Sequence, residues 1–227
     1  MLSGLRWLAL EVWFLDRARE FYAEHLDLPV RRADDHEVVL DTGGAALVLR
    51  APGPVPRGGV HVHYALATTR AHYGEYFAAL SATLDVSEVD FGGARSLYFY
   101  DPDDHCVELG ERAAGDDPVD GFFEVVLEVE DLARAESFYR DLGFSVVDRG
   151  ETRRRVRLTG PVDLELWEPQ RGLADARGGV HVDLGFTSPD PEAAVRAVAD
   201  RVCSVETLDD GRRVRDPNGH YLTFERG

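Results

Sequence analysis

Two short stretches of the chain carry the side chains best suited to metal chemistry. Residues 58–66 read GGVHVHYAL and residues 97–109 read LYFYDPDDHCVEL. Because side chains alternate between the two faces of a strand, His61 and His63 share the polar face of the first stretch, and Glu108 lies on the polar face of the second. Imidazole and carboxylate groups on the inner faces of two strands are suitable ligands for a divalent transition metal.

Three blocks of the first half of the chain recur, in the same order, in the second half. They are LxRAxxFY (15–22 and 132–139), GGVHV (58–62 and 178–182) and a DP dipeptide followed by His (101–105 and 216–220). A repeat of this kind predicts an internal duplication, with two halves of the same fold.

Hydrophobic alternation and turn residues divide each half into two modules of strands around one helix. In the first half we predict strands 8–12, 36–40, 45–50, 60–67, 85–89, 95–100 and 105–110, with helices from 15 and over 70–82. In the second half we predict strands 122–129, 144–149, 153–159, 162–168, 180–187, 203–207, 211–215 and 220–225, with helices 131–141 and 190–201. One helix for several strands is typical of an α+β fold with helices on one face of a curved sheet. We predict domains at 1–112 and 121–227, joined by a polar linker at 113–120.

Charge and composition exclude several classes of function. The chain has 42 Asp and Glu against 25 basic residues, all of them Arg, and a formal net charge of −17. Such an acidic chain disfavours nucleic acids and anionic membranes, and is typical of proteins from the salt-rich cytoplasm of halophilic organisms. The first residues lack the basic region and cleavage site typical of a signal peptide, and no apolar run reaches the roughly 18 residues of a membrane span. Cys106 and Cys203 form no disulfide framework, so we expect a cytoplasmic protein.

These motifs resemble those of the vicinal oxygen chelate superfamily, which includes glyoxalase I, fosfomycin- and bleomycin-resistance proteins and extradiol dioxygenases. The resemblance rests on residues 15–28, on residues 132–144 and on the Asp-Pro-x-x-His ends at 101–109 and 216–224, with Phe14 in place of the family's Asp. It covers nearly the whole chain. It implies tandem glyoxalase-like domains, each of two βαβββ modules that form a curved, cup-shaped sheet with helices outside.

The resemblance also implies metal-ligand positions on the first and last strands of the modules. Carried over one at a time, they fall on His63, Glu108, Glu124 and Glu165, and on Trp7, Val48, Asp183 and Thr223. If the cups form across the two halves, which is the arrangement we predict, the first four residues share one cup and bind Fe, Mn, Ni or Zn. The other cup is then free of metal and holds Trp7, Val48, Asp183 and Thr223.

If each half forms its own cup, the ligands divide differently. The first half keeps His63 and Glu108, with His61 as a third ligand, and the second keeps Glu124, Glu165 and Asp183. His105 and His220, on the turns before the last strands, are expected to hold those turns and not a metal.

The implied function is that of a metal-dependent enzyme, glyoxalase/lyase- or dioxygenase-like, acting on a small substrate with vicinal oxygens. Its metal would act as a Lewis acid, and Glu108 or Glu165 would be the catalytic general base. The alternative is a metal-free protein of the bleomycin-resistance type that binds or sequesters a small molecule. The substrate pocket is expected to include Trp7, His61, Trp167 and Asp183. The chain is expected to be a monomer or a homodimer.

Overall fold

The computed structural model describes residues 2–53, 62–113, 115–152, 154–168 and 182–227. The first module consists of β1 (Gly4–Glu11), α1 (Leu15–Leu26), β2 (Val30–Ala33), β3 (Glu37–Asp41) and β4 (Ala46–Arg50). The second consists of β5 (His63–Thr69), α2 (Arg70–Ser81), β6 (Ser87–Asp90), β7 (Arg95–Tyr100) and β8 (Cys106–Ala113). The third consists of β9 (Phe122–Glu128), α3 (Leu132–Asp141), β10 (Ser145–Arg149), β11 (Arg155–Thr159) and β12 (Asp163–Trp167). The fourth consists of β13 (Asp183–Ser188), α4 (Pro191–Val198), β14 (Ser204–Leu208), β15 (Gly211–Arg215) and β16 (Tyr221–Arg226).

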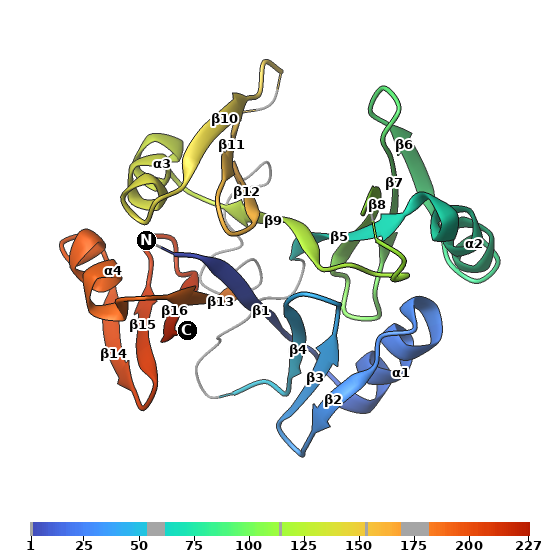
Figure 1. Cartoon of the computed structure of the whole chain (residues 1–227), viewed down its shortest axis with the longest axis horizontal. Coiled ribbons are helices and arrows are strands. Elements are labelled where there is room, and N and C mark those ends of the chain that lie inside the picture. Colours follow the sequence, from blue (N-terminus) through green and yellow to red (C-terminus); the bar gives the residue numbers. More distant parts are fainter. Residues whose placement is uncertain (1, 54–61, 114, 153, 169–181) are drawn as a thin grey trace.

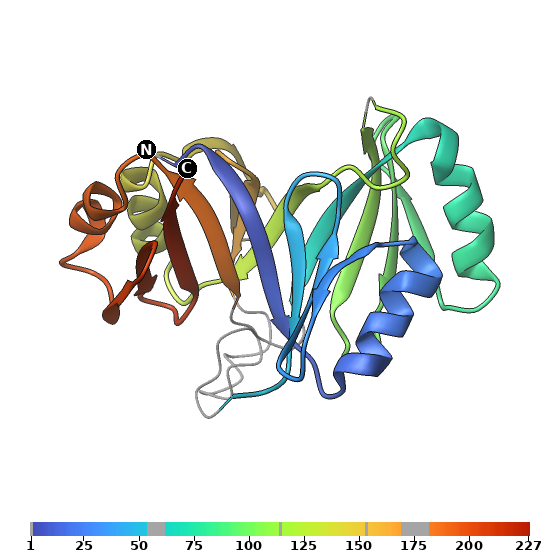
Figure 2. The same cartoon turned by 60° about the horizontal axis from the view of Figure 1, so that its bottom comes forward.

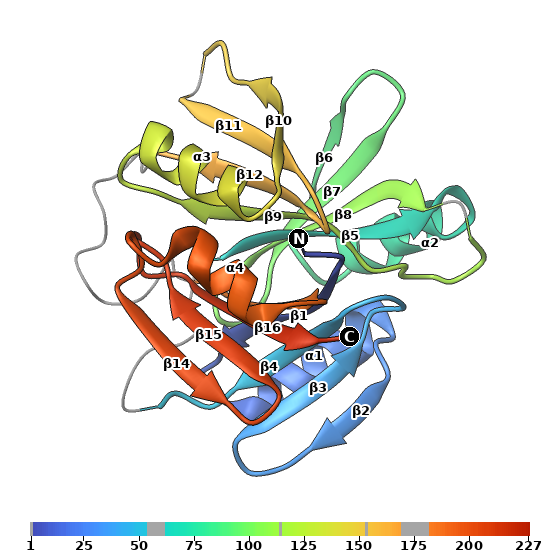
Figure 3. The ribbon, with the colours of Figure 1, turned by 60° about the vertical axis from the view of Figure 1, so that its left-hand side comes forward.

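The modules build two eight-stranded sheets, and each sheet takes one module from each half (Figures 1 and 3). Sheet A has the order β14-β15-β16-β13-β1-β4-β3-β2, and sheet B the order β10-β11-β12-β9-β5-β8-β7-β6. At the junctions β1 pairs antiparallel with β13, and β5 pairs antiparallel with β9. The structure therefore has the predicted α+β fold with the modules crossed between halves, and each predicted domain, 1–112 and 121–227, contributes to both sheets.

The helices lie against one face of each sheet (Figure 2). Each helix buries one apolar stripe. In α1 the buried positions are Ala18, Phe21, Tyr22 and Leu26, a spacing that places them on one face of a helix. Helix α3 begins with the side chain of Asp131 accepting a hydrogen bond from the Arg134 N–H, whereas Phe14 at the start of α1 provides no such cap. No helix within the described ranges is long and apolar enough to cross a membrane.

Strand β2 is the element that the sequence analysis missed. Val30–Ala33 pairs with β3 at the edge of sheet A, and all four of its residues are exposed. An edge strand pairs with another strand on one side only. Because neither face of β2 is buried, it needs no alternation of apolar residues, and charged residues such as Arg31 and Arg32 are common at such edges. The pattern that identifies a half-buried strand was therefore absent.

A buried carboxylate joins the two modules of each half. In the first half Asp101 accepts hydrogen bonds from the Tyr22 hydroxyl at 2.6 Å and from His105 Nδ1 at 2.7 Å, and the Tyr64 hydroxyl donates to Tyr22 at 2.7 Å. Burial, and to a lesser degree the charge of Asp101, raises the pKa of Tyr22 well above its ordinary value, so this hydroxyl stays protonated and donates a hydrogen bond. Burial raises the pKa of Asp101, but His105 and Tyr22 lower it by more, so this group stays charged.

The second half repeats the tyrosine–aspartate hydrogen bond, but its histidine ring contacts backbone groups. The Tyr139 hydroxyl donates to Asp216 at 2.9 Å, and His220 lies 2.8 Å from the Glu128 carbonyl through Nε2. Both His105 and His220 are fully buried. Their contacts agree with the predicted role in holding the turns before β8 and β16.

We predict that Tyr22→Phe destabilises the chain more than Tyr139→Phe. The first change removes a donor from buried Asp101 and an acceptor from the buried Tyr64 hydroxyl, and should lower the free energy of unfolding by roughly 2–3 kcal/mol. The second removes one hydrogen bond and should cost about 1–2 kcal/mol. Denaturant unfolding of both variants measures the difference, and equal costs would contradict this account.

Candidate functional site

The centre of sheet B brings together the four residues that the motifs predict as ligands. His63 begins β5, Glu108 lies in β8, Glu124 in β9 and Glu165 in β12, and these strands are neighbours in the sheet. Ala65 is opposite both Glu108 and Glu124 in register, so the side chains of all three point to the same face. We call this concave face cup B. The four residues line one cavity there of about 540 Å³.

The donor atoms of cup B are removed from solvent. Glu108, Glu124 and Glu165 are 4, 6 and 8% exposed. His63 Nε2 lies 3.5 Å from Glu108 Oε2, is itself buried, and makes no hydrogen bond with any described residue. The His63 ring packs edge-on against Trp167, with 5.7 Å between ring centroids. A buried nitrogen without a partner is costly, and a bound group in the cavity would satisfy it.

Two arginines of β11 also enter cup B, and the sequence analysis did not identify them. Arg155 Nη1 lies 3.0 Å from Glu165 Oε1, and Arg157 Nη2 lies 2.7 Å from Glu124 Oε2. The Trp167 indole N–H donates to Glu165 Oε2 at 2.7 Å. The signal was present in the sequence, because Arg155 and Arg157 alternate with apolar residues in a predicted strand and so share its polar face.

The carboxylates of cup B differ in their affinity for protons. Burial, and to a lesser degree the negative charge of Glu165, raises the pKa of Glu124 to about 8. The nearby Arg157 offsets only part of this increase. Burial also raises the pKa of Glu108, but interactions with His63, Ser96 and Tyr98 lower it by more, so its pKa lies below the usual value. Glu108 is therefore charged at neutral pH, and Glu124 holds a proton.

The donor types of cup B fit a divalent cation, but the side chains are not arranged around one. One imidazole, whose Nε2 makes no hydrogen bond with a described residue, and three carboxylates form a typical set for Fe, Mn, Ni or Zn. Among the described residues, however, no three His, Cys, Asp or Glu side chains have the arrangement of a metal site. Guanidinium groups hold Glu124 and Glu165 instead.

The corresponding face of sheet A, which we call cup A, contains the other predicted set. Asp183 is fully buried and pairs with Arg50, while Arg213 Nε donates to the Thr223 hydroxyl at 3.2 Å. Trp7 lies over Gly185, where a Cβ atom would come within 2.2 Å of Trp7 Cδ2. Ala9, Ala46 and Val48 form a small apolar cluster with Trp7.

The predicted pocket residues therefore divide between the two cups. Trp167 lines the cavity of cup B, whereas Trp7 lines a cavity of about 730 Å³ in cup A and Asp183 is buried beside that cavity's Arg50. His61 lies outside the described residues.

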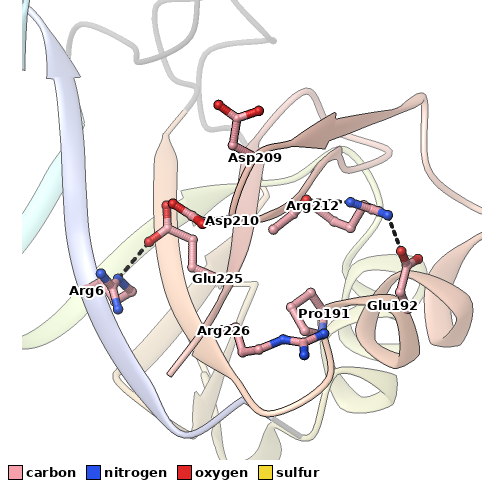
Figure 4. A pocket seen from close by; sticks show the side chains of 9 residues that line it. Arg6, Pro191, Glu192, Asp209, Asp210, Arg212, Glu225 and Arg226 are labelled. Carbon is pink, nitrogen blue, oxygen red and sulfur yellow. Dashed lines mark hydrogen bonds and ion pairs between the residues drawn. The ribbon is translucent and has the colours of Figure 1, made fainter.

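A further pocket of about 360 Å³ lies beside α4, at the end of sheet A (Figure 4). Two of its carboxylates pair with arginines: Arg6 lies 2.9 Å from Glu225, and Arg212 contacts Glu192 (Figure 4). Its lining contains no His or Cys. This pocket brings together none of the residues that the motifs single out.

Solved structures with the same fold match nearly the whole chain. Glyoxalase I from Zea mays has a TM-score of 0.71 and is 18% identical, over 98% of this chain and 92% of its own. A mutant of that enzyme gives a TM-score of 0.73 at the same identity and coverage. The cppA protein from Streptococcus pneumoniae TIGR4 has a TM-score of 0.65 and is 14% identical, over 100% of this chain and 98% of its own. No protein-family model matches the sequence, and a search of the curated proteins finds no match.

We predict that Glu124 makes the stability of the metal-free protein depend on pH. The folded chain keeps this proton up to about pH 8, whereas the unfolded chain releases it near pH 4.5. Stability should therefore fall as the pH rises through this window, by at most about 1.4 kcal/mol per pH unit. Glu124→Gln should remove that part of the slope. Unfolding of both proteins in a chelator from pH 5 to 9 tests this, and parallel curves would contradict it.

Proposed function

We propose that this chain, which has the tandem fold of the vicinal oxygen chelate proteins, binds a divalent metal and a small substrate with vicinal oxygens in cup B. The reaction is of the glyoxalase/lyase or dioxygenase type. One observation carries the proposal: four donor residues from the two halves of the sequence line a single cavity, and His63 Nε2 is buried there without a hydrogen-bond partner among the described residues.

His63, Glu108, Glu124 and Glu165 would hold the cation. When bound, a divalent cation supplies a Lewis acid for negative charge that develops on the substrate oxygens. We assign the general base to Glu108, because the indole N–H of Trp167 already donates to Glu165.

The walls of cup B orient the substrate and limit its contact with water. Trp167, Tyr98 and Phe123 line the cavity. Burial, and to a lesser degree the charge of Glu108, raises the pKa of Tyr98 far above its ordinary value, so its hydroxyl stays protonated and can donate to Glu108. A pocket of aromatic walls with a few fixed polar groups is typical of small-molecule sites.

A second candidate function is that of a metal-free protein that binds or sequesters a small molecule. The observation that favours it is the pairing of Arg155 and Arg157 with two of the four ligand positions. Those guanidinium groups would then recognise an acidic group of the ligand, and Trp167 would pack against its apolar part.

We predict about one Fe, Mn, Ni or Zn per chain in protein purified without chelators or a nickel column. The His63→Ala, Glu108→Ala double variant should contain none, because it loses the imidazole and one of the carboxylates. Elemental analysis of the two proteins, in dilute buffer and in molar KCl, measures this.

The matched control is the Asp35→Ala, His36→Ala double variant. It also removes one carboxylate and one imidazole, but from exposed positions outside cup B. It should keep its metal. Wild-type protein without metal, even after each ion has been added back, would overturn the enzyme proposal and favour the metal-free binder.

A further inference from the structure

We propose that Arg155 and Arg157 are internal counter-ions of cup B: they occupy the metal carboxylates of the metal-free protein and move to outer carboxylates when a cation binds. This inference rests on the metal site proposed above. It explains why the donor types fit a metal while their arrangement does not.

Arg155 contacts one carboxylate inside the cup and one outside it. Its Nη1 lies 3.0 Å from Glu165 Oε1, and its Nη2 lies 2.7 Å from Asp148 Oδ2 on β10. The Glu165 side chain is 10% exposed and the Asp148 side chain 52% exposed. Release of Glu165 would therefore leave the guanidinium with a partner at the surface.

Arg157 repeats this arrangement two residues further along the same face of β11. Its Nη2 lies 2.7 Å from Glu124 Oε2 inside the cup, and its Nε lies 3.2 Å from Asp163 Oδ2. The Asp163 side chain is 31% exposed, against 8% for Glu124. Both arginines are thus placed to exchange a buried carboxylate for a more exposed one.

The charges of cup B give the exchange its physical reason. Buried carboxyl groups this close together disfavour one another's negative charge, and when no metal is bound the two guanidinium groups offset the charge that remains. A guanidinium supplies this compensation, but it also repels an incoming cation and uses the carboxylate oxygens that the cation needs. A cation can therefore bind with its full set of ligands only if the guanidinium groups leave.

Cup A provides the comparison within the same chain. Its Arg50 pairs with fully buried Asp183 and also contacts Glu37, at 3.3 Å, on the neighbouring strand β3. The Arg50 side chain is only 14% exposed, compared with 26% for Arg155 and 33% for Arg157. Arg50 is thus more deeply enclosed than the arginines of cup B, and its guanidinium takes the place of a cation in a cup expected to hold no metal.

The test measures metal affinity and thermal stability together in the full chain. We expect the Arg155→Gln, Arg157→Gln double variant to bind Mn²⁺ or Zn²⁺ at least about tenfold more tightly than the wild type in a calorimetric titration. The same variant, in a chelator, should melt at a lower temperature, because its buried carboxylates lose their counter-ions. The control is Arg154→Gln, which removes a charge next to β11 from an exposed arginine that pairs with Glu168. It should change neither quantity.

A second set of variants leaves cup B intact and alters the outer partners. Asp148→Asn and Asp163→Asn should weaken metal binding severalfold, because the released guanidinium groups then have no charged acceptor. Glu168→Gln, the partner of Arg154, is the matched control.

The outcomes separate this inference from the proposal on which it rests. Unchanged or weaker metal affinity in the arginine variant, together with a lower melting temperature, would show that the arginines are only structural and would overturn the inference. Absence of metal binding in every variant and in the wild type would overturn the proposed metal site itself. Tighter binding in the arginine variant with weaker binding in the Asp148→Asn variant would support both.

Discussion

The buried carboxylate of Asp101, with its counterpart Asp216, is the interaction on which the rest of the structure depends. Asp101 receives the Tyr22 hydroxyl from helix α1 and His105 from the turn before β8, so it joins a helix packed on sheet A to a strand of sheet B. The modules of one half belong to different sheets, and these contacts join them. The strand that follows this turn carries Glu108 into cup B, so the geometry of the candidate site also depends on this contact.

The two cups show how one backbone supports two electrostatic environments. Position 65 of cup B and position 185 of cup A each lie between two strands that contribute to the floor of the cup. Around Ala65 these strands supply Glu108 and Glu124, whereas around Gly185 they supply Thr223 and Trp7. The indole needs the space that glycine leaves. At this position one cup thus gathers carboxylates and the other an indole and a threonine hydroxyl, although the strands are equivalent.

Much of the site could be predicted from residue types in strands. Period-two alternation predicted the inner face of β8 and β12, because one face of each strand is apolar and buried, and the family resemblance then pointed to Glu108, Glu124 and Glu165 as ligand positions. The same reasoning failed for β2, whose four residues are all exposed. Arg155 and Arg157 are on the polar face of a predicted strand, but which carboxylates they meet depends on the register with β12 and on the position of β9, and local sequence does not fix either.

The sequence by itself determined the repeat, the four modules and the face on which each candidate ligand lies, since these follow from local periodicity and from turn residues. Only the tertiary structure decided which modules share a sheet. Strands β1 and β5 each begin a module of the first half, and each has a free edge. That edge could pair with β9 or β13 of the second half, or β1 and β5 could pair with each other. Main-chain hydrogen bonds are the same for every partner, so they do not select one. Packing of the helices and the buried Tyr–Asp contacts are the interactions that distinguish the arrangements, and both are long-range.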